Sequence, residues 1–120
     1  MGKLEPFPNT VKNRDYNINI TCSEFTSLCP KTSQPDFAII KISYIPDKLC
    51  IELKSFKLYM FSYRNVGEFH EHVTNKILDV FVMACKPKYV SVTGDSNVRG
   101  GIKTIVQAEH KKKNKSRKSW

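Results

Sequence analysis

Residues 16–22 read Tyr-Asn-Ile-Asn-Ile-Thr-Cys, so apolar and polar side chains alternate along seven positions. A period of two is typical of a β-strand that buries one face and exposes the other. The stretch 37–45 is rich in isoleucine and aromatic residues, and the turn pair Pro46-Asp47 ends it. The two stretches predict neighbouring antiparallel strands, with a loop over 24–35 between them and a short extended segment over 48–53 after them.

Two helical patterns follow the predicted strands. Between residues 55 and 63, apolar side chains recur at three- and four-residue spacing, as on the buried face of a helix. A longer run over 68–86 repeats this spacing and stops before Pro87, which cannot continue a helix. Two more strands are expected over 89–93 and 102–108, with Arg99-Gly100-Gly101 as the turn between them.

The order of strands, helices and strands predicts an α+β fold, in which an antiparallel sheet carries two helices on one face. A sheet in so small a domain leaves its edges and its second face uncovered, and association of several copies would cover them. We expect residues 1–13 to form an irregular lead-in, 14–110 to form a single domain and 111–120 to be a disordered basic tail.

The composition of the 120 residues, 40% hydrophobic and 26% charged, excludes collagen-like, low-complexity and largely disordered classes. The net charge is +9, but six of the 20 Lys and Arg residues lie between Lys111 and Lys118, which leaves +3 for the rest of the chain. Such a tail can contact phosphates, or it can simply remain solvated. No apolar stretch is long enough to cross a membrane and the N-terminus lacks a signal-peptide pattern, so a cytoplasmic protein is expected.

The four cysteines are spaced 7, 21 and 35 residues apart, which matches neither a zinc site nor a Cys-x-x-Cys motif. A cytoplasmic location also disfavours disulfides. Cys22, Cys50 and Cys85 lie in or beside apolar stretches, so we expect them to be small buried side chains.

Cys29 and Asp36 are the first candidates for chemistry. Cys29 lies in a stretch that Pro30 and Pro35 stiffen, and the nearby Lys31 would favour its thiolate form. A thiolate nucleophile and a carboxylic proton donor are the minimal pair for covalent addition to a polar multiple bond. The spacing alone leaves open a plain alternative, a buried loop cysteine and an aspartate that caps a turn.

Two other groups of polar residues are candidates for binding. Lys54, Lys57 and Arg64 lie near the start of the first predicted helix, where they can bind an anion or merely solvate the helix surface. Further on, Glu71 can accept hydrogen bonds from a guanine-like ring, and His70 can carry a proton. On a helix, residues 70 and 72 face apart and no third ligand offers itself, so no metal site is expected.

The stretches 24–37 and 52–59 and the triplet Phe69-His70-Glu71, in this order, resemble the 7-cyano-7-deazaguanine reductases, the nitrile reductases of queuosine biosynthesis. The resemblance is to the short, single-module branch of this family and covers roughly residues 14–109. It implies the tunnelling fold (T-fold), whose subunits assemble into an oligomeric barrel. It also implies a homo-oligomer whose sites lie near the interfaces between subunits.

The resemblance implies the chemical roles of two residues. Cys29 would add to the nitrile carbon of 7-cyano-7-deazaguanine and give a covalent thioimide, and Asp36 would protonate the nitrile nitrogen. Two hydrides, one from each of two NADPH molecules, would then give the primary amine 7-aminomethyl-7-deazaguanine, which is used in tRNA modification.

Binding roles follow from the same resemblance. The backbone of Ile51, Glu52 and Leu53, together with His70 and Glu71, would hold the deazaguanine base. Three residues of the 52–59 signature would contact NADPH, namely Lys54, Ser55 and Lys57. The sequence holds no Gly-x-Gly-x-x-Gly, so no Rossmann cofactor site is expected, and NADPH would occupy a surface cleft that a neighbouring subunit completes.

Two other functions remain open at this point. An amidine-forming transferase, similar to the archaeal branch, would form the same Cys29 adduct but let ammonia attack it on tRNA, and it would not need the cofactor signature at 52–59. A non-catalytic module would bind RNA through the basic residues 111–118, which leaves Cys29, Asp36 and Glu71 without a purpose. The reductase itself requires neither a nucleic acid nor a membrane.

Overall fold

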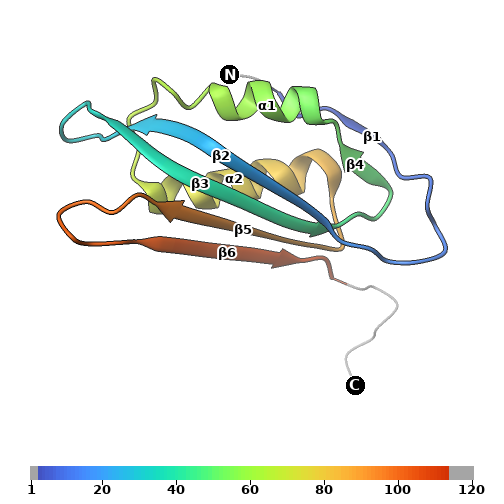
Figure 1. The fold of residues 1–120 in the computed structure, drawn as a ribbon. Coiled ribbons are helices and arrows are strands. Elements are labelled where there is room, and N and C mark those ends of the chain that lie inside the picture. The colour runs from blue at the N-terminus through green and yellow to red at the C-terminus, as the bar shows by residue number, and fades with distance from the viewer. Residues whose placement is uncertain (1–2, 114–120) are drawn as a thin grey trace.

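The structure, a computed structural model, describes residues 3–113 and is drawn in Figure 1. In the described residues, four antiparallel strands form the main sheet in the order β2-β3-β5-β6, and β1 and β4 form a separate antiparallel pair. The strands are β1 (Pro6–Pro8), β2 (Ile18–Leu28), β3 (Pro35–Ile45), β4 (Leu49–Ile51), β5 (Tyr89–Ser96) and β6 (Ile105–Lys111). The helices are α1 (Leu53–Phe61) and α2 (His70–Cys85). The predicted α+β class, with antiparallel strands and two helices, is confirmed.

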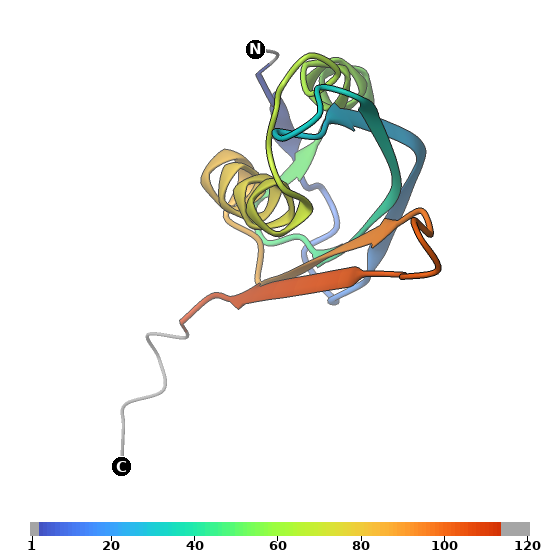
Figure 2. The same cartoon turned by 90° about the vertical axis from the view of Figure 1, so that its left-hand side faces the viewer.

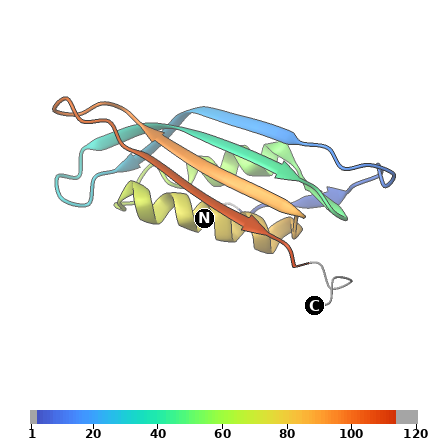
Figure 3. The same cartoon turned by 90° about the horizontal axis from the view of Figure 1, so that it is seen from below.

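Both helices lie on the same face of the main sheet, which curves around them (Figures 2 and 3). Alternate residues of β3, from Ala38 to Tyr44, are at most 2% exposed and form the sheet side of the core. The helix side comes from residues of α2 spaced four apart, Val73, Ile77 and Phe81, which are all buried. The rings of Phe81 and Tyr44 meet edge to face, with their centroids 4.7 Å apart. One core therefore fixes α2 against the middle of the sheet.

β2 runs further than the sequence predicted. Its pairing with β3 shifts register between Cys22 and Phe25, where β2 carries one extra residue. Such a bulge interrupts the alternation of apolar and polar side chains, which is why the predicted strand stopped at Cys22. The predicted loop over 24–35 is therefore wrong in extent, and only residues 29–34 connect β2 to β3.

The lead-in predicted as irregular contains β1, which pairs with β4. Its two prolines argue against a strand in general, but they are tolerated in a short edge strand. The next residue, Asn9, is buried, and its side chain fastens the lead-in with three hydrogen bonds. Its Nδ2 donates to the carbonyl oxygen of Asp47 at 2.9 Å, and its Oδ1 accepts from the N–H of Val11 at 3.1 Å and from the hydroxyl of Tyr16 at 2.7 Å.

The C-terminal region is ordered further than the prediction of a tail from residue 111 suggested. β6 includes Lys111, and Lys112 Nζ lies 2.6 Å from Asp47 Oδ2. The hydrogen bond from Lys112 lowers the pKa of the Asp47 carboxyl. The rest of the predicted basic tail, residues 114–120, lies outside the described residues.

The helix ends follow from local chemistry. The carboxylate of Glu52 caps α1, accepting the backbone N–H groups of Lys54 at 2.6 Å and Ser55 at 2.7 Å. α2 ends at Lys86, which has the left-handed conformation (φ 46°) that commonly terminates a helix, and Pro87 follows. Neither of these described helices has the length and apolar character that a membrane crossing requires.

Three connections meet at one end of the main sheet (Figure 1). They are the turn between β2 and β3, the segment between α1 and α2, and the loop between β5 and β6. Backbone hydrogen bonds join them. The N–H of Leu28 donates to Val66 O at 3.0 Å, the N–H of Glu68 donates to Leu28 O at 3.2 Å, and the N–H of Asn97 donates to Phe37 O at 3.1 Å.

Gly94 marks a close approach of α2 to β5. A Cβ atom at this position would lie 2.5 Å from Thr74 Oγ1, well inside van der Waals contact. We expect Gly94→Ala to lower the free energy of unfolding by about 1–3 kcal/mol, the usual cost of overpacking a core, which thermal denaturation would register as a lower Tm.

Gly67→Ala is the matched control, because its Cβ would meet Pro30 Cα at an ordinary 3.7 Å. Combining Gly94→Ala with Thr74→Ala removes the obstructing oxygen and should recover part of the loss. An unchanged Tm in Gly94→Ala alone would contradict the close packing of α2 on the sheet.

Candidate functional site

Cys29 is the first residue after β2, in a tight turn that its own backbone closes. The N–H of Cys29 donates to Gln34 O at 2.8 Å, and the N–H of Ser33 donates to Cys29 O at 2.9 Å. Ser33 adopts a positive φ of 59°, which lets the chain reverse within these few residues. The cysteine is half-buried, so its thiol is both held and reachable.

Strand register places Asp36 beside this cysteine. Ser27 pairs directly with Asp36 across the β2–β3 ladder, and Cys29 follows Ser27 by two residues. In a ladder, residues two apart share a face, and diagonal neighbours lie about 7–8 Å apart. The predicted nucleophile and the predicted proton donor therefore occupy neighbouring positions on one face of the sheet.

The segment before α2 brings His70 to the same place. Residues 66–68 run alongside Leu28 through two backbone hydrogen bonds, which fixes the start of α2 next to the cysteine turn. His70 Nε2 lies 3.9 Å from Asp36 Oδ2, and the two side chains are only 18% and 14% exposed. Three predicted site residues, Cys29, Asp36 and His70, thus gather at one end of the sheet.

The turn tunes the thiol of Cys29. Hydrogen bonding from the Thr32 hydroxyl and from the backbone N–H groups of Lys31 and Thr32 lowers the pKa of the Cys29 thiol below its ordinary value, although burial and the charge of Asp36 oppose it. Lys31 was predicted to act through its charge, but here it acts through its backbone N–H. Thr32 was missed, because a hydroxyl three residues along the chain reaches the sulfur only once the turn has formed.

The other cysteines are a different class of thiol. All four are free, and Cys50 and Cys85 are buried as predicted, whereas Cys22 is half-buried. Burial raises the pKa of Cys85 to about 12 and also raises the pKa of Cys22. Cys29, half-buried and with a lowered pKa, is therefore the thiol best prepared to react.

Glu71 lies at the exposed side of the first turn of α2. Together with Phe69, His72 and Asn75 it lines an open hollow of about 610 Å³. His72 Nε2 is 3.1 Å from Glu68 Oε2, whereas His70 turns to Asp36, so the two histidines face different partners. Glu71 thus follows directly after His70, a member of the Cys29 cluster (Cys29, Asp36 and His70). The carboxylate of Glu71, however, is presented to solvent.

The remaining predicted residues lie far from Cys29 within one chain. Asp36 is at the start of β3, whereas the junction between β4 and α1 follows the end of β3. The 11 residues of this strand span about 35 Å. There Ile51 is buried in the core, Glu52 is the helix cap, and Leu53 is exposed. The structure does not bring residues 51–57 to the cysteine.

The three residues predicted to contact the cofactor differ in whether their polar side-chain groups are available to bind a ligand. Ser55 is buried, and its hydroxyl donates to Glu52 O at 2.8 Å and accepts the N–H of Glu5 at 2.9 Å. Lys54 and Lys57 are exposed on α1. Lys57 borders a groove of about 290 Å³ between α1 and β2, and Arg64 borders the same groove, 5.0 Å from the Phe61 ring centre.

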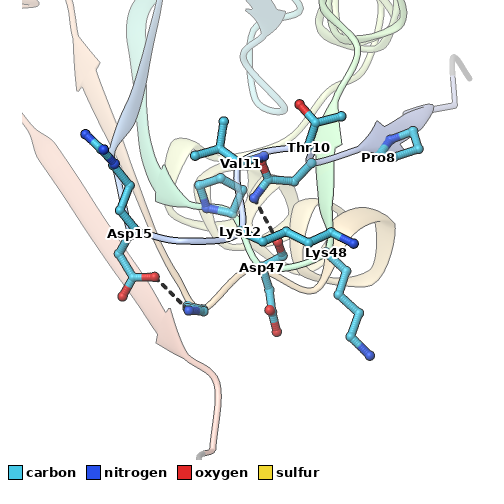
Figure 4. A pocket seen from close by; sticks show the side chains of 11 residues that line it. Pro8, Thr10, Val11, Lys12, Asp15, Asp47 and Lys48 are labelled. Carbon is cyan, nitrogen blue, oxygen red and sulfur yellow. Dashed lines mark hydrogen bonds and ion pairs between the residues drawn. The ribbon is translucent and has the colours of Figure 1, made fainter.

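A larger pocket of about 680 Å³ lies at the far end of the sheet from Asp36, between the lead-in and the β3–β4 turn (Figure 4). The side chains of Asp15 and Lys88 pair there at 2.6 Å, which raises the pKa of Lys88, and Asn9 holds Asp47. None of the predicted site residues lines it. This pocket forms where the N-terminal lead-in packs against the β3–β4 turn, and it is separate from the Cys29 cluster.

The sequence was compared with models of known protein families. A family model described as QueF-like protein matches residues 35–115, more than half of the chain. The chain belongs to the QueF-like family. The matched span includes Asp36, His70 and Glu71, and Cys29 lies just before it.

Curated relatives of this QueF-like protein extend the likeness. The NADPH-dependent 7-cyano-7-deazaguanine reductase of Nitrosomonas eutropha is 60% identical over 111 residues, which are 92% of this chain and 80% of that protein. The proteins of the same name from Nitrosococcus oceani and Halorhodospira halophila are 55% and 56% identical, cover 91% and 89% of this chain, and are themselves covered to 84% and 91%. The family resemblance seen in the sequence is confirmed.

A solved structure shares the fold. The archaeosine synthase QueF-Like, in its apo form, matches with a TM-score of 0.73 at 28% sequence identity, covering 78% of this chain and 91% of that one. This likeness fits the T-fold that the resemblance implied.

The reactivity of Cys29 gives a direct test of the turn. Thr32→Val removes the hydroxyl that favours the thiolate, so the pKa of Cys29 should rise and its alkylation by iodoacetamide should shift to higher pH. Peptide mass spectrometry at several pH values would follow this one cysteine. Thr26→Val is the control, since the hydroxyl of Thr26 bonds its own strand at Glu24 O. Coincident curves for Thr32→Val and the unaltered protein would rule out the role given to this hydroxyl.

Proposed function

We propose that this QueF-like protein reduces the nitrile of 7-cyano-7-deazaguanine to the primary amine 7-aminomethyl-7-deazaguanine, consuming two NADPH. The observation that carries the proposal is a chain 60% identical to a named reductase, in which Cys29 has a lowered pKa and lies next to Asp36. Relatives named for the same NADPH-dependent reaction cover about nine-tenths of the chain. The reductase therefore accounts for both the relatives and the grouping of residues.

Cys29 acts first in the proposed mechanism. Its thiolate attacks the nitrile carbon, one electron pair of the C≡N bond moves to the nitrogen, and the nitrogen takes up a proton from Asp36. The product is a neutral thioimide, in which the carbon is a better hydride acceptor than it is in the nitrile. Hydrogen bonding lowers the pKa of Cys29, which favours the thiolate form that attacks.

Asp36 and His70 handle the protons of the later steps. NADPH, when bound, supplies one hydride to the thioimide carbon and a second hydride to the imine that remains after the Cys29 thiolate leaves. His70, whose Nε2 is 3.9 Å from Asp36, is placed to return protons to the carboxylate. Over the whole cycle one nitrile, two hydrides and two protons give one primary amine, and the Cys29 thiolate that added to the nitrile is released again.

Glu71 reads the base in this proposal. A carboxylate accepts two hydrogen bonds from the adjacent N–H groups of a guanine-like ring. Glu71 is exposed at the start of α2 and borders an open hollow, so a flat ring can approach it from solvent. Phe69, which is 54% exposed and lines the same hollow, offers an apolar surface to that ring.

Lys54 and Lys57 are the cofactor contacts that we propose for this chain. Both ammonium groups are on the exposed surface of α1, as phosphate binding requires. The Ser55 hydroxyl already donates its proton to Glu52 O and accepts the N–H of Glu5, so Ser55 supports this surface by holding α1 to the residue before β1. Arg64 adds a third positive charge beside the groove that Lys57 borders.

A second copy of the chain completes the site. Residues 51–57 lie at the opposite end of β3 from Cys29, and one chain cannot fold them onto the thiol. In a ring of subunits, the start of α1 in one copy can face the Cys29 turn of its neighbour, and the unpaired edges of β2 and β6 provide a means of association. This arrangement is the oligomeric barrel that a T-fold implies.

An amidine-forming transferase is the second candidate, and the observation behind it is the likeness to archaeosine synthase. It would use the same Cys29 adduct, and ammonia would attack the thioimide carbon and displace the thiolate. No hydride would be used, so the two candidates differ in whether NADPH is consumed.

Intact-mass and absorbance measurements test the proposed reaction. Without NADPH, the protein should gain the mass of one 7-cyano-7-deazaguanine, and with NADPH, two equivalents should be oxidised per nitrile consumed. Cys29→Ala should lose both signals, whereas Cys22→Ala should keep the adduct. Asp36→Asn should bind the base but lower kcat by about 10²–10⁴-fold, as loss of a general acid does. An adduct that ammonia, and not NADPH, resolves would favour the transferase.

Mixed assemblies test whether the site is shared. Cys29→Ala and a Lys54→Ala/Lys57→Ala variant should each be inactive, and their co-expression under two different tags allows mixed oligomers to be purified. If copies mix at random, about a quarter of the interfaces pair an intact Cys29 with intact lysines, so a comparable fraction of activity should return. Mixed oligomers that stay inactive would mean that each site belongs to one chain.

A further inference from the structure

Arg99 contacts the predicted proton donor from a loop to which the sequence analysis gave only the role of a turn. Its Nη2 lies 2.6 Å from Asp36 Oδ1 and also donates to the carbonyl oxygen of Pro35 at 2.7 Å. One guanidinium nitrogen therefore bridges the backbone and the side chain at the start of β3. The Asp36 side chain is 14% exposed, whereas that of Arg99 is 57% exposed.

The backbone places Arg99 there. Its N–H and carbonyl oxygen exchange hydrogen bonds with Ile102 at 3.0 and 2.9 Å, which closes a two-residue turn through Gly100 and Gly101. Both glycines have positive φ, 57° and 78°, as a tight hairpin turn of this kind requires. The N–H of Asn97 donates to Phe37 O, which ties the same loop to β3 next to Asp36.

The groups that face the Asp36 carboxylate come from three elements. Arg99 reaches Oδ1 from the β5–β6 loop, His70 faces Oδ2 from α2 at 3.9 Å, and Cys29 is the diagonal neighbour from the β2–β3 turn. A thiolate and a carboxylate so close would repel each other in a partly buried site. Of the two basic groups, Arg99 is in direct contact and is charged at every physiological pH.

We propose that Arg99 is a positioning residue of this site, whose guanidinium holds the Asp36 carboxylate at the start of β3 and neutralises the charge that Asp36 presents to Cys29. The thiolate and the carboxylate then coexist in one small site. The inference deepens the proposed function, on which its catalytic meaning rests, but the electrostatic claim concerns the protein without any substrate. The charge of Asp36 is one of the groups that raise the pKa of Cys29, which agrees with this role.

The contact also decides when Asp36 can act as an acid. A guanidinium pairs with the ionised carboxylate, and a carboxylate can donate only after it has taken up a proton. While Arg99 occupies Oδ1, the proton that Asp36 donates to a nitrile nitrogen is therefore carried on Oδ2, the oxygen that faces His70.

The pH dependence of Cys29 alkylation by iodoacetamide, read by peptide mass spectrometry on the full chain, tests the proposal without substrate or cofactor. Arg99→Ala unmasks the charge of Asp36, so the curve should move to higher pH and alkylation near pH 7 should slow several-fold, as for any acid beside an unscreened like charge. Arg99→Lys should keep the curve close to that of the unaltered protein. Adding Asp36→Asn to Arg99→Ala should reverse the shift, because no charge is left to screen.

Lys103→Ala is the matched control, since Lys103 is in the same loop and pairs with a different carboxylate, Asp95 Oδ1, at 2.6 Å. It should leave the Cys29 curve unchanged. The inference is overturned if Arg99→Ala leaves the curve in place, or if the double variant Arg99→Ala/Asp36→Asn stays as shifted as Arg99→Ala. Failure of the protein to reduce the nitrile would refute the proposed function and would leave the alkylation result standing, so the two are separable.

Discussion

The pairing register of β2 with β3 positions the two central residues of the proposed site. Ser27 stands opposite Asp36, so the residue two places on, Cys29, falls on the same face just where the ladder ends. A slip of one residue would turn Asp36 to the other face of the sheet and into solvent. The buried row from Ala38 to Tyr44 prevents such a slip, because it would have to leave the core at the same time. The hydrophobic core therefore sets the geometry of the site.

The second constraint on the site is the repulsion between two negative charges, the Cys29 thiolate and the Asp36 carboxylate. Groups from four separate segments of the chain form this site and reduce the repulsion. The thiolate of Cys29 is favoured by hydrogen bonds within its own turn, and the carboxylate of Asp36 is met by Arg99 on one oxygen and by His70 on the other. Each partner is held by backbone bonds of its own segment. Because these segments meet only at this end of the sheet, the site forms together with the tertiary fold and cannot precede it.

Sequence reasoning predicted both helices, the strands of the main sheet, and the residues Cys29, Asp36 and His70 that the structure groups together. It failed where the signal lies outside local periodicity. The bulge in β2 hid half of that strand, and β1 has no periodicity of its own and depends on pairing with β4. Thr32 and Arg99 escaped notice for a related reason: an exposed threonine and an arginine before two glycines look like ordinary turn residues until the turn and the hairpin bring them to the sulfur and to Asp36.

The signature at 52–59 serves the fold and the proposed site at once, which explains why it looks so specific. Glu52 caps α1, and Ser55 joins α1 to the residue before β1. These polar residues therefore have a structural role within one chain. Lys54 and Lys57, between and after them, are exposed on α1, and the start of this helix lies at the end of the sheet that lacks the cysteine. In the proposed reductase, this charged surface would serve the thiol of another copy, because it is rigidly held but remote from its own thiol. The cap that starts the helix would then also present the lysines to a neighbour, and assembly would be a condition for catalysis.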